Sequence, residues 1–147
     1  METESVTVDP RARALARHLD CSTDDVSEGY RDGVFEHGRS DYLVLTDEEA
    51  DDLVRERIEE SLWAFNAEFI ASHTKPRLAG PAVKALREVQ EKLCERANDL
   101  VLALIDDFDR FVQDAIGADG RGHFLAQHDG HENEIKVDGT FYYIYRE

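Results

Sequence analysis

The stretch from Thr46 to His73 is the feature that most constrains the fold of this chain. It opens on a capping box, in which the Thr46 side chain accepts a hydrogen bond from the amide three residues on and Glu49 reaches back. Apolar residues then recur at steps of three and four: Ala50, Leu53, Val54, Ile58, Leu62, Phe65 and Phe69. The pattern predicts a long amphipathic helix that ends near His73, because Lys75-Pro76 disfavours further helix. Trp63 widens the apolar stripe, either as core or as a surface for a partner.

A second helical region follows after a short link. Pro81 suits the first position of a helix, where its missing amide proton is no loss. A helical period runs through Leu86, Val89, Leu93, Ala97, Leu100, Leu104 and Phe108. The pattern predicts a second long helix and allows a break around Asp106 before helix resumes to Ile116. The link between the two helices is about eight residues, so we expect them to pack antiparallel.

Two further segments have the pattern of β-hairpins. Residues 34–37 and 41–45 flank a turn at Gly38, and residues 134–137 and 141–145 flank Asp138-Gly139. Asp-Gly favours a hairpin because both central positions of the turn adopt positive φ. An isolated hairpin is only marginally stable, so we expect the two hairpins to join in one antiparallel sheet.

Together these elements predict an α+β fold, with two long antiparallel helices packed on a small antiparallel sheet. The sheet is made of an N-terminal and a C-terminal hairpin. A shorter helix, apolar at Ala14, Leu15 and Leu19, begins at Pro10. We expect residues 1–9 to be a flexible N-terminus and residues 10–147 to form a single domain.

The charge of the chain excludes several classes of function. The 147 residues carry 33 acidic and 17 basic side chains, a formal net charge of −16. Such a chain is unsuited to bind nucleic acid directly or to be attracted to anionic lipid. No segment approaches the roughly 20 apolar residues that span a bilayer, and no secretory signal is visible. Cys21 and Cys94 have no CxxC partner and indicate free thiols, so we expect a cytoplasmic protein.

The acidity itself has two interpretations. The basic residues are 13 Arg and only 4 Lys, and excess carboxylate with few lysines is typical of proteins adapted to molar salt. There the Debye length is about 3 Å, so carboxylate repulsion is screened. Alternatively, the carboxylates imitate a nucleic-acid backbone and block a nucleic-acid-binding protein. Mimicry requires carboxylates in a row at phosphate-like spacing, which the sequence alone does not establish.

The densest group of chemically versatile side chains lies between Asp119 and Glu132. Here Arg121 stands between two glycines, close to the histidines His123, His128 and His131. This group suits an anion-binding site, a phosphoesterase centre or a metal site on the three histidines. It equally suits a polar loop in which glycines supply the turns. The spacing matches no tight metal or catalytic motif, so we assign no catalytic residue, no metal ligand and no cofactor.

Several segments of the chain resemble a known group of proteins. They are YLVLTDEEAD at 42–51, SLWAFN at 61–66, DGRGHFL at 119–125, DG at 129–130 and YIYR at 143–146. The resemblance covers roughly residues 30–147 and is to a family of small acidic proteins from phage, plasmid and archaeal-virus genomes. In that family Tyr often takes the place of His128, so the resemblance does not imply a three-histidine metal site. It implies instead a binding unit of Arg121, His123, Asp129 and Gly130, in a halophilic member.

Three hypotheses about function follow. The first is a non-enzymatic protein-interaction module of a virus, provirus or plasmid in a halophile, with a basic or nucleic-acid-binding protein as its partner. Its sharpest form is inhibition of a host defence nuclease by nucleic-acid mimicry. The second is a small enzyme or an anion- or ligand-binding domain centred on Arg121, His123 and Asp129. In the third, Arg121 pairs internally and the Gly-Arg-Gly-His segment only stabilises the fold. The oligomeric state is not predicted.

Overall fold

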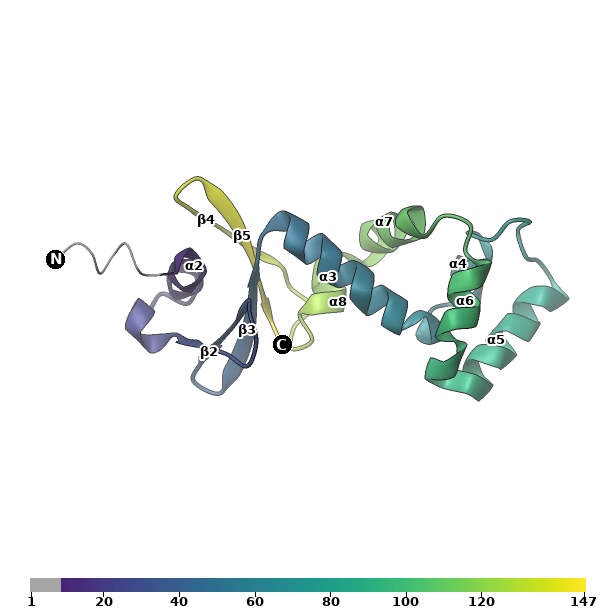
Figure 1. The fold of residues 1–147 in the computed structure, drawn as a ribbon, viewed down its shortest axis with the longest axis horizontal. Coiled ribbons are helices and arrows are strands. Elements are labelled where there is room, and N and C mark those ends of the chain that lie inside the picture. Colours follow the sequence, from purple (N-terminus) through teal and green to yellow (C-terminus); the bar gives the residue numbers. More distant parts are fainter. Residues whose placement is uncertain (1–8) are drawn as a thin grey trace. The chain divides into compact units, whose positions relative to one another are not determined.

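The computed structural model describes residues 9–147, which form an α+β fold as predicted (Figure 1). The expected flexible N-terminus lies outside the described residues, except for Asp9, whose carboxylate accepts from the amide of Arg11 at 2.9 Å. The described chain divides into a sheet unit of residues 9–53 and 120–147 and a helical unit of residues 54–119. A single domain over residues 10–147 stays a prediction.

The sheet unit contains both predicted hairpins. Its elements are α2 (Pro10–Leu19), η1 (Thr23–Asp25), β1 (Ser27–Glu28), β2 (Val34–His37), β3 (Ser40–Leu45), the start of α3 (Asp47–Glu60), α8 (Arg121–Leu125), β4 (Asn133–Val137) and β5 (Thr140–Arg146). In this part of the chain the strands form one antiparallel sheet in the order β1-β2-β3-β5-β4. The two hairpins meet where β3 pairs with β5, with Val44 opposite Ile144. The prediction of one sheet from two hairpins is therefore confirmed.

Side-chain alternation decides which strand residues face α2, which lies against the sheet in Figure 1. A buried cluster joins one face of the sheet to this helix; its members are Ala14, Leu15, Phe35, Tyr42, Val44, Val137, Tyr142 and Ile144. On the opposite face Val34, Leu43 and Tyr145 are also buried. We expected the two long helices to cover the sheet. In the sheet unit the short N-terminal helix α2 covers this face, and the packing of the long helical regions on the sheet stays a prediction.

The helical unit corrects the prediction of two long helices. Its elements are the end of α3, η2 (Leu62–Ala64), α4 (Ala67–Ala71), α5 (Pro81–Leu93), η3 (Cys94–Ala97), α6 (Asn98–Leu104) and α7 (Phe108–Asp119). Both helical regions begin where the sequence predicts, at Asp47 and Pro81, and the second one breaks around Asp106. Each region is nevertheless a series of shorter helices.

Local backbone chemistry explains these breaks. The Asn66 side-chain oxygen accepts from the amides of Glu68 at 2.8 Å and Phe69 at 3.0 Å, so it starts a new helix inside the predicted one. Cys94 adopts φ +51°, which interrupts the second region after Leu93. The helical spacing of apolar residues survives because each short helix still presents an apolar side to the interior. The rings of Phe65, Phe69 and Phe111 meet there, with centroids 5.0 to 6.0 Å apart.

Two further expectations concern cysteine chemistry and membranes. Cys21 and Cys94 are free thiols, as predicted. Within residues 9–147, no helix combines the length and the apolar character needed to cross a bilayer.

Candidate functional site

Arg121 is held inside the sheet unit by three carboxylates that come from two distant segments. Its Nε donates to Glu132 at 2.7 Å, and its Nη1 donates to the carboxylates of Asp47 at 2.9 Å and Asp51 at 3.0 Å. Nη1 also donates to the main-chain carbonyl of Asp47 at 3.1 Å. Gly120, with φ +82°, makes the turn that starts α8 and precedes Arg121. The group is called the arginine cluster below.

The guanidinium of Arg121 is used internally. Its side chain is 9% exposed, and its Cζ lies 4.6 Å from the centroid of the Tyr143 ring. Burial by itself lowers the pKa of Arg121, but the hydrogen bond to Glu132 and its charge outweigh burial, so the pKa is raised. Arg121 is therefore a permanent cation whose Nε and Nη1 donate to protein acceptors. This arrangement favours the hypothesis in which Arg121 pairs internally.

Two tyrosines of β5 complete the arginine cluster. The buried Tyr145 hydroxyl donates to the same Glu132 oxygen that accepts from Arg121. Burial, followed by this hydrogen bond, raises the pKa of Tyr145. The Tyr143 hydroxyl donates to Glu134 at 3.0 Å, and this bond raises the pKa of Tyr143. Both phenols therefore stay protonated near neutral pH and act as donors.

The other predicted binding residues lie outside the arginine cluster. His123 is exposed and packs edge-on against its neighbour Phe124, with ring centroids 4.9 Å apart. The Asp129 carboxylate accepts from the amide of His131 at 3.0 Å and so makes a local turn. In the described part of the chain, no hydrogen bond or ion pair joins Arg121, His123 and Asp129. Residues 9–147 also contain no group of three His, Cys, Asp or Glu side chains placed to hold a metal ion.

Gly130, the fourth predicted binding residue, packs against Gly122, the second glycine of the Gly-Arg-Gly segment. Its carbonyl oxygen lies 2.2 Å from the position that a Cβ on Gly122 would occupy. Its amide donates to the carbonyl of Ala126 at 2.7 Å. Gly122 is therefore required by a close backbone contact, and this contact explains the second glycine of the Gly-Arg-Gly segment.

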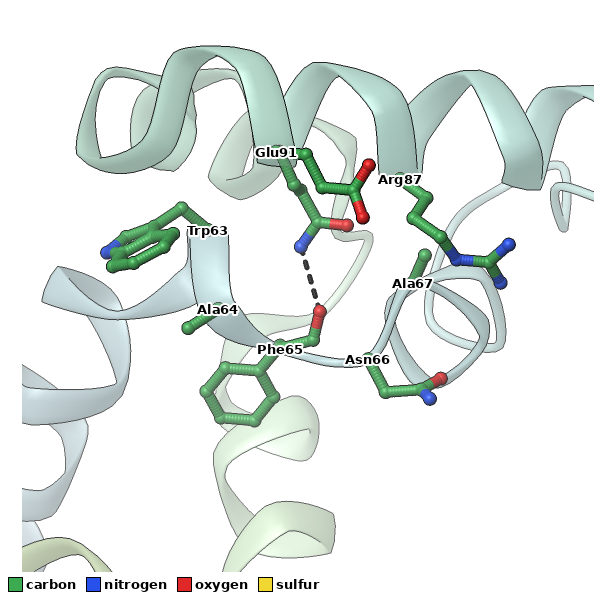
Figure 2. Close-up of a pocket in the computed structure, with 8 residues that line it drawn as sticks. Trp63, Ala64, Phe65, Asn66, Ala67, Arg87 and Glu91 are labelled. Atoms are coloured by element: carbon green, nitrogen blue, oxygen red, sulfur yellow. Dashed lines mark hydrogen bonds between the residues drawn. The ribbon is translucent and has the colours of Figure 1, made fainter.

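The helical unit contains a hollow of about 350 Å³ that the sequence reasoning missed (Figure 2). It lies between the segment around η2 and one side of α5, and its lining residues are Trp63, Ala64, Phe65, Asn66, Ala67, Arg87, Gln90 and Glu91. In Figure 2, Trp63 and Arg87 stand at opposite ends of the hollow, with Glu91 between them. The signal in the sequence was Gln90, a polar residue four positions after the apolar Leu86 on the inner side of a predicted helix.

Gln90 is the buried polar group of this hollow. It is 4% exposed, and its Nε2 donates both protons, to the carbonyls of Leu62 at 3.1 Å and Phe65 at 2.9 Å. The second bond is the dashed line in Figure 2. Because both donors are used, only the acceptor Oε1 of Gln90 remains for a ligand, and it accepts no hydrogen bond from the described residues.

A second hollow, of about 340 Å³, is mainly polar. It is lined by Ser72, His73, Thr74, Asp106, Asp107, Arg110 and Asp114. His73 Nε2 lies 3.2 Å from the Asp114 carboxylate, and the carbonyl of His73 accepts from the amide of Asp106 at 2.8 Å. These contacts connect the end of α4 to α7 and the segment before it, so the polar groups that make them stabilise the helical unit.

Comparison with known proteins returned no family model, no curated protein and no solved structure that matches this chain. We therefore infer function from the residues of this chain and their geometry.

Proposed function

We propose that this protein is a non-enzymatic interaction module that binds a basic protein through the exposed side of α3. The observation that carries the proposal is a row of carboxylates on this helix: Glu48, Asp52, Glu56 and Glu59. All four are exposed, and within the described residues none of them forms an ion pair. The group is called the acidic row below.

The spacing of the acidic row follows from helix geometry alone. A helix rises about 1.5 Å per residue, so carboxylates four positions apart are about 6 Å apart along the axis. Lysines or arginines on a partner helix with the same spacing can face every member of the row. The row is also held firmly, because Ala50, Val54 and Ile58 on the other side of α3 are fully buried.

Neighbouring carboxylates of α3 have internal partners, which sets the acidic row apart. Asp47 and Asp51 bind Arg121, and Glu49 binds Arg11 through two hydrogen bonds. These ion pairs stabilise the fold itself, whereas the carboxylates of the acidic row can bind a partner. Repeated exposed carboxylates are also what mimicry of a phosphate backbone requires. We therefore propose that the partner is a nucleic-acid-binding protein.

The proposal also includes the kind of host and the kind of genetic element from which the protein comes. Excess carboxylate and scarce lysine suit a halophilic cytoplasm, and the resemblance described above suits a virus, provirus or plasmid of such a host. In molar salt a surface ion pair contributes little, so binding must include short-range contacts in addition to charge.

Capture of the partner tests the proposal. The chain is immobilised and exposed to a lysate of its source organism at increasing KCl concentration, and duplex DNA is then added as a competitor. The row variant carries Glu48→Gln, Asp52→Asn, Glu56→Gln and Glu59→Gln. The control variant carries Glu36→Gln, Glu88→Gln, Glu95→Gln and Asp99→Asn, which removes the same charge from other exposed positions.

The expected result is that the row variant loses a basic protein that the wild type and the control variant retain. Duplex DNA should displace that protein, because both ligands use the same basic surface. Equal capture by the two variants would exclude the acidic row as the docking surface. A monomeric chain that captures no protein at any salt concentration would refute the proposal as a whole.

A further inference from the structure

We propose that the hollow between Trp63 and Arg87 binds a small zwitterion, a free α-amino acid with an apolar side chain. This inference goes beyond the proposed function, because it adds a small-molecule site in the helical unit. It rests on charged and polar groups of both signs that line one hollow: Arg87, Gln90 and Glu91.

The two charged ends of the hollow come from one helix. Arg87 and Glu91 are four residues apart on α5, so they are neighbours on its surface. Arg87 forms an ion pair with Glu68 at 3.8 Å, but both side chains are at least half exposed, so the pair is weak and the carboxylate of a ligand can replace it. No hydrogen bond or ion pair uses the Glu91 carboxylate within the described residues. A ligand therefore meets a cation for its carboxylate and an anion for its ammonium group.

The fixed group of the site is Gln90. Because its two donors are held by the carbonyls of Leu62 and Phe65, its Oε1 is a preoriented acceptor. Gln90 as a residue is 4% exposed, but its Oε1 is not one of the buried atoms without a partner, so it is open to the hollow, where water or a ligand can donate to it. An ammonium group has three donors, so it can bind Glu91 and Gln90 together.

The apolar part of the hollow selects the side chain of the ligand. Trp63, Ala64 and Ala67 line the hollow beside the charged groups. Trp63 is half-buried and its main-chain amide donates to Asn98 at 2.9 Å, so this wall is anchored to the helical unit. A volume of about 350 Å³ is near the lower end of the range for small-molecule sites, which fits an amino acid better than a larger cofactor.

The same residues disfavour a ligand that is only an anion and a ligand that is only a cation. A simple anion that binds Arg87 also faces the carboxylates of Glu91 and Glu68. A simple cation that binds Glu91 also faces the guanidinium of Arg87. A zwitterion satisfies both ends, which is why we choose it over either.

Tryptophan fluorescence gives a direct test, because Trp63 is the only tryptophan of the chain. The wild-type protein is titrated with L-leucine, N-acetyl-L-leucine, L-leucinamide and glycine. Leucine should cause a saturable change, and each blocked form should bind about tenfold more weakly because it lacks one charged group. Glycine should bind weakly because it has no side chain for the apolar wall.

Two substitutions locate the site by their opposite selectivity. Glu91→Gln should weaken leucine binding about tenfold and leave N-acetyl-leucine unchanged, because that ligand has no ammonium group. Arg87→Gln should weaken leucine binding and leave leucinamide unchanged. Glu88→Gln, an exposed carboxylate of the same helix outside the hollow, is the control and should bind leucine as the wild type does.

Several outcomes would overturn the inference. It is wrong if no ligand gives a saturable change, or if the two blocked forms bind as tightly as leucine. It is also wrong if Glu88→Gln weakens binding as much as Glu91→Gln. None of these results bears on the acidic row, which is tested by protein capture, so the two proposals fail separately.

Discussion

Replacing Arg121 by alanine removes the cation of the arginine cluster and leaves Glu132 without its charged partner. Glu132 is only one-third exposed, so its hydrogen bond to Arg121 contributes about 1.5–3 kcal/mol. Asp47 and Asp51 are more than half exposed, and solvent screening limits them together to about 1 kcal/mol. The contact with the Tyr143 ring adds about 0.5–1 kcal/mol. We expect Arg121→Ala to lower the free energy of unfolding by about 3–5 kcal/mol.

Urea unfolding followed by circular dichroism measures this loss. For 147 residues a loss of about 3–5 kcal/mol corresponds to a decrease in Tm of about 10–15 °C. Arg39→Ala, at an exposed arginine of the sheet unit, is the control and should change stability by less than about 0.5 kcal/mol. In a double-mutant cycle with Glu132→Gln, the two losses should be strongly non-additive.

The opposite result would refute the internal role of Arg121. If Arg121→Ala unfolds at nearly the wild-type urea concentration, the guanidinium does not stabilise the fold. If it also abolishes binding of a phosphate or carboxylate ligand, the ligand-binding hypothesis for Arg121, His123 and Asp129 replaces the structural one.

Three further predictions concern packing, pH and salt. Gly122→Ala should destabilise the protein by at least about 2 kcal/mol, because its Cβ would meet the Gly130 carbonyl. Gly117→Ala in α7 is the control and should be neutral or stabilising, because its Cβ would have no atom within 4 Å. The Tm of each variant measures the difference, and equal Tm values would contradict this reasoning. The raised pKa of Tyr145 means that the unfolded chain loses this proton first, near pH 10, so stability is intact below about pH 10 and falls above it. Tyr145→Phe should make this decline shallower in urea titrations between pH 8 and 11, and an unchanged slope would exclude Tyr145 as a cause. With a net charge of −16, raising KCl from about 0.1 M to 2 M should raise the Tm, and a Tm independent of KCl would argue against a salt-adapted surface.

The sheet was the most predictable part of the fold, because its signals are local. Asp138 and Gly139 have φ of +51° and +84°, as the Asp-Gly turn requires. The period of two correctly separates Tyr142 and Ile144, which face α2, from Tyr143 and Tyr145 on the other side. We inferred that the two hairpins join because a lone hairpin is only marginally stable. The pairing of β3 with β5 confirms this prediction.

The sequence correctly predicted where the two helical regions begin, but it did not predict that each consists of several short helices. Apolar spacing reports which side of a segment faces the interior, and that side is kept when the backbone breaks. The breaks themselves depend on single residues, such as the Asn66 side chain that caps α4 and the positive φ of Cys94. Neither residue type is a strong stop signal, so the period alone favoured longer helices.

For the candidate sites, the sequence drew attention to Arg121 and to the segment that contains Trp63, but it did not supply their surroundings. The Asp47 carboxylate that binds Arg121 is 74 residues away along the chain, and Gln90 is 25 residues from the Phe65 carbonyl that holds it. The sequence by itself determined the capping box, the turns, the apolar periods and the net charge, because each depends on nearby residues or on composition. The tertiary structure decided which carboxylates neutralise Arg121, which remain exposed on α3 and which polar groups line the hollow, because hydrogen bonds and ion pairs between distant segments form only when packing brings them within about 3 Å.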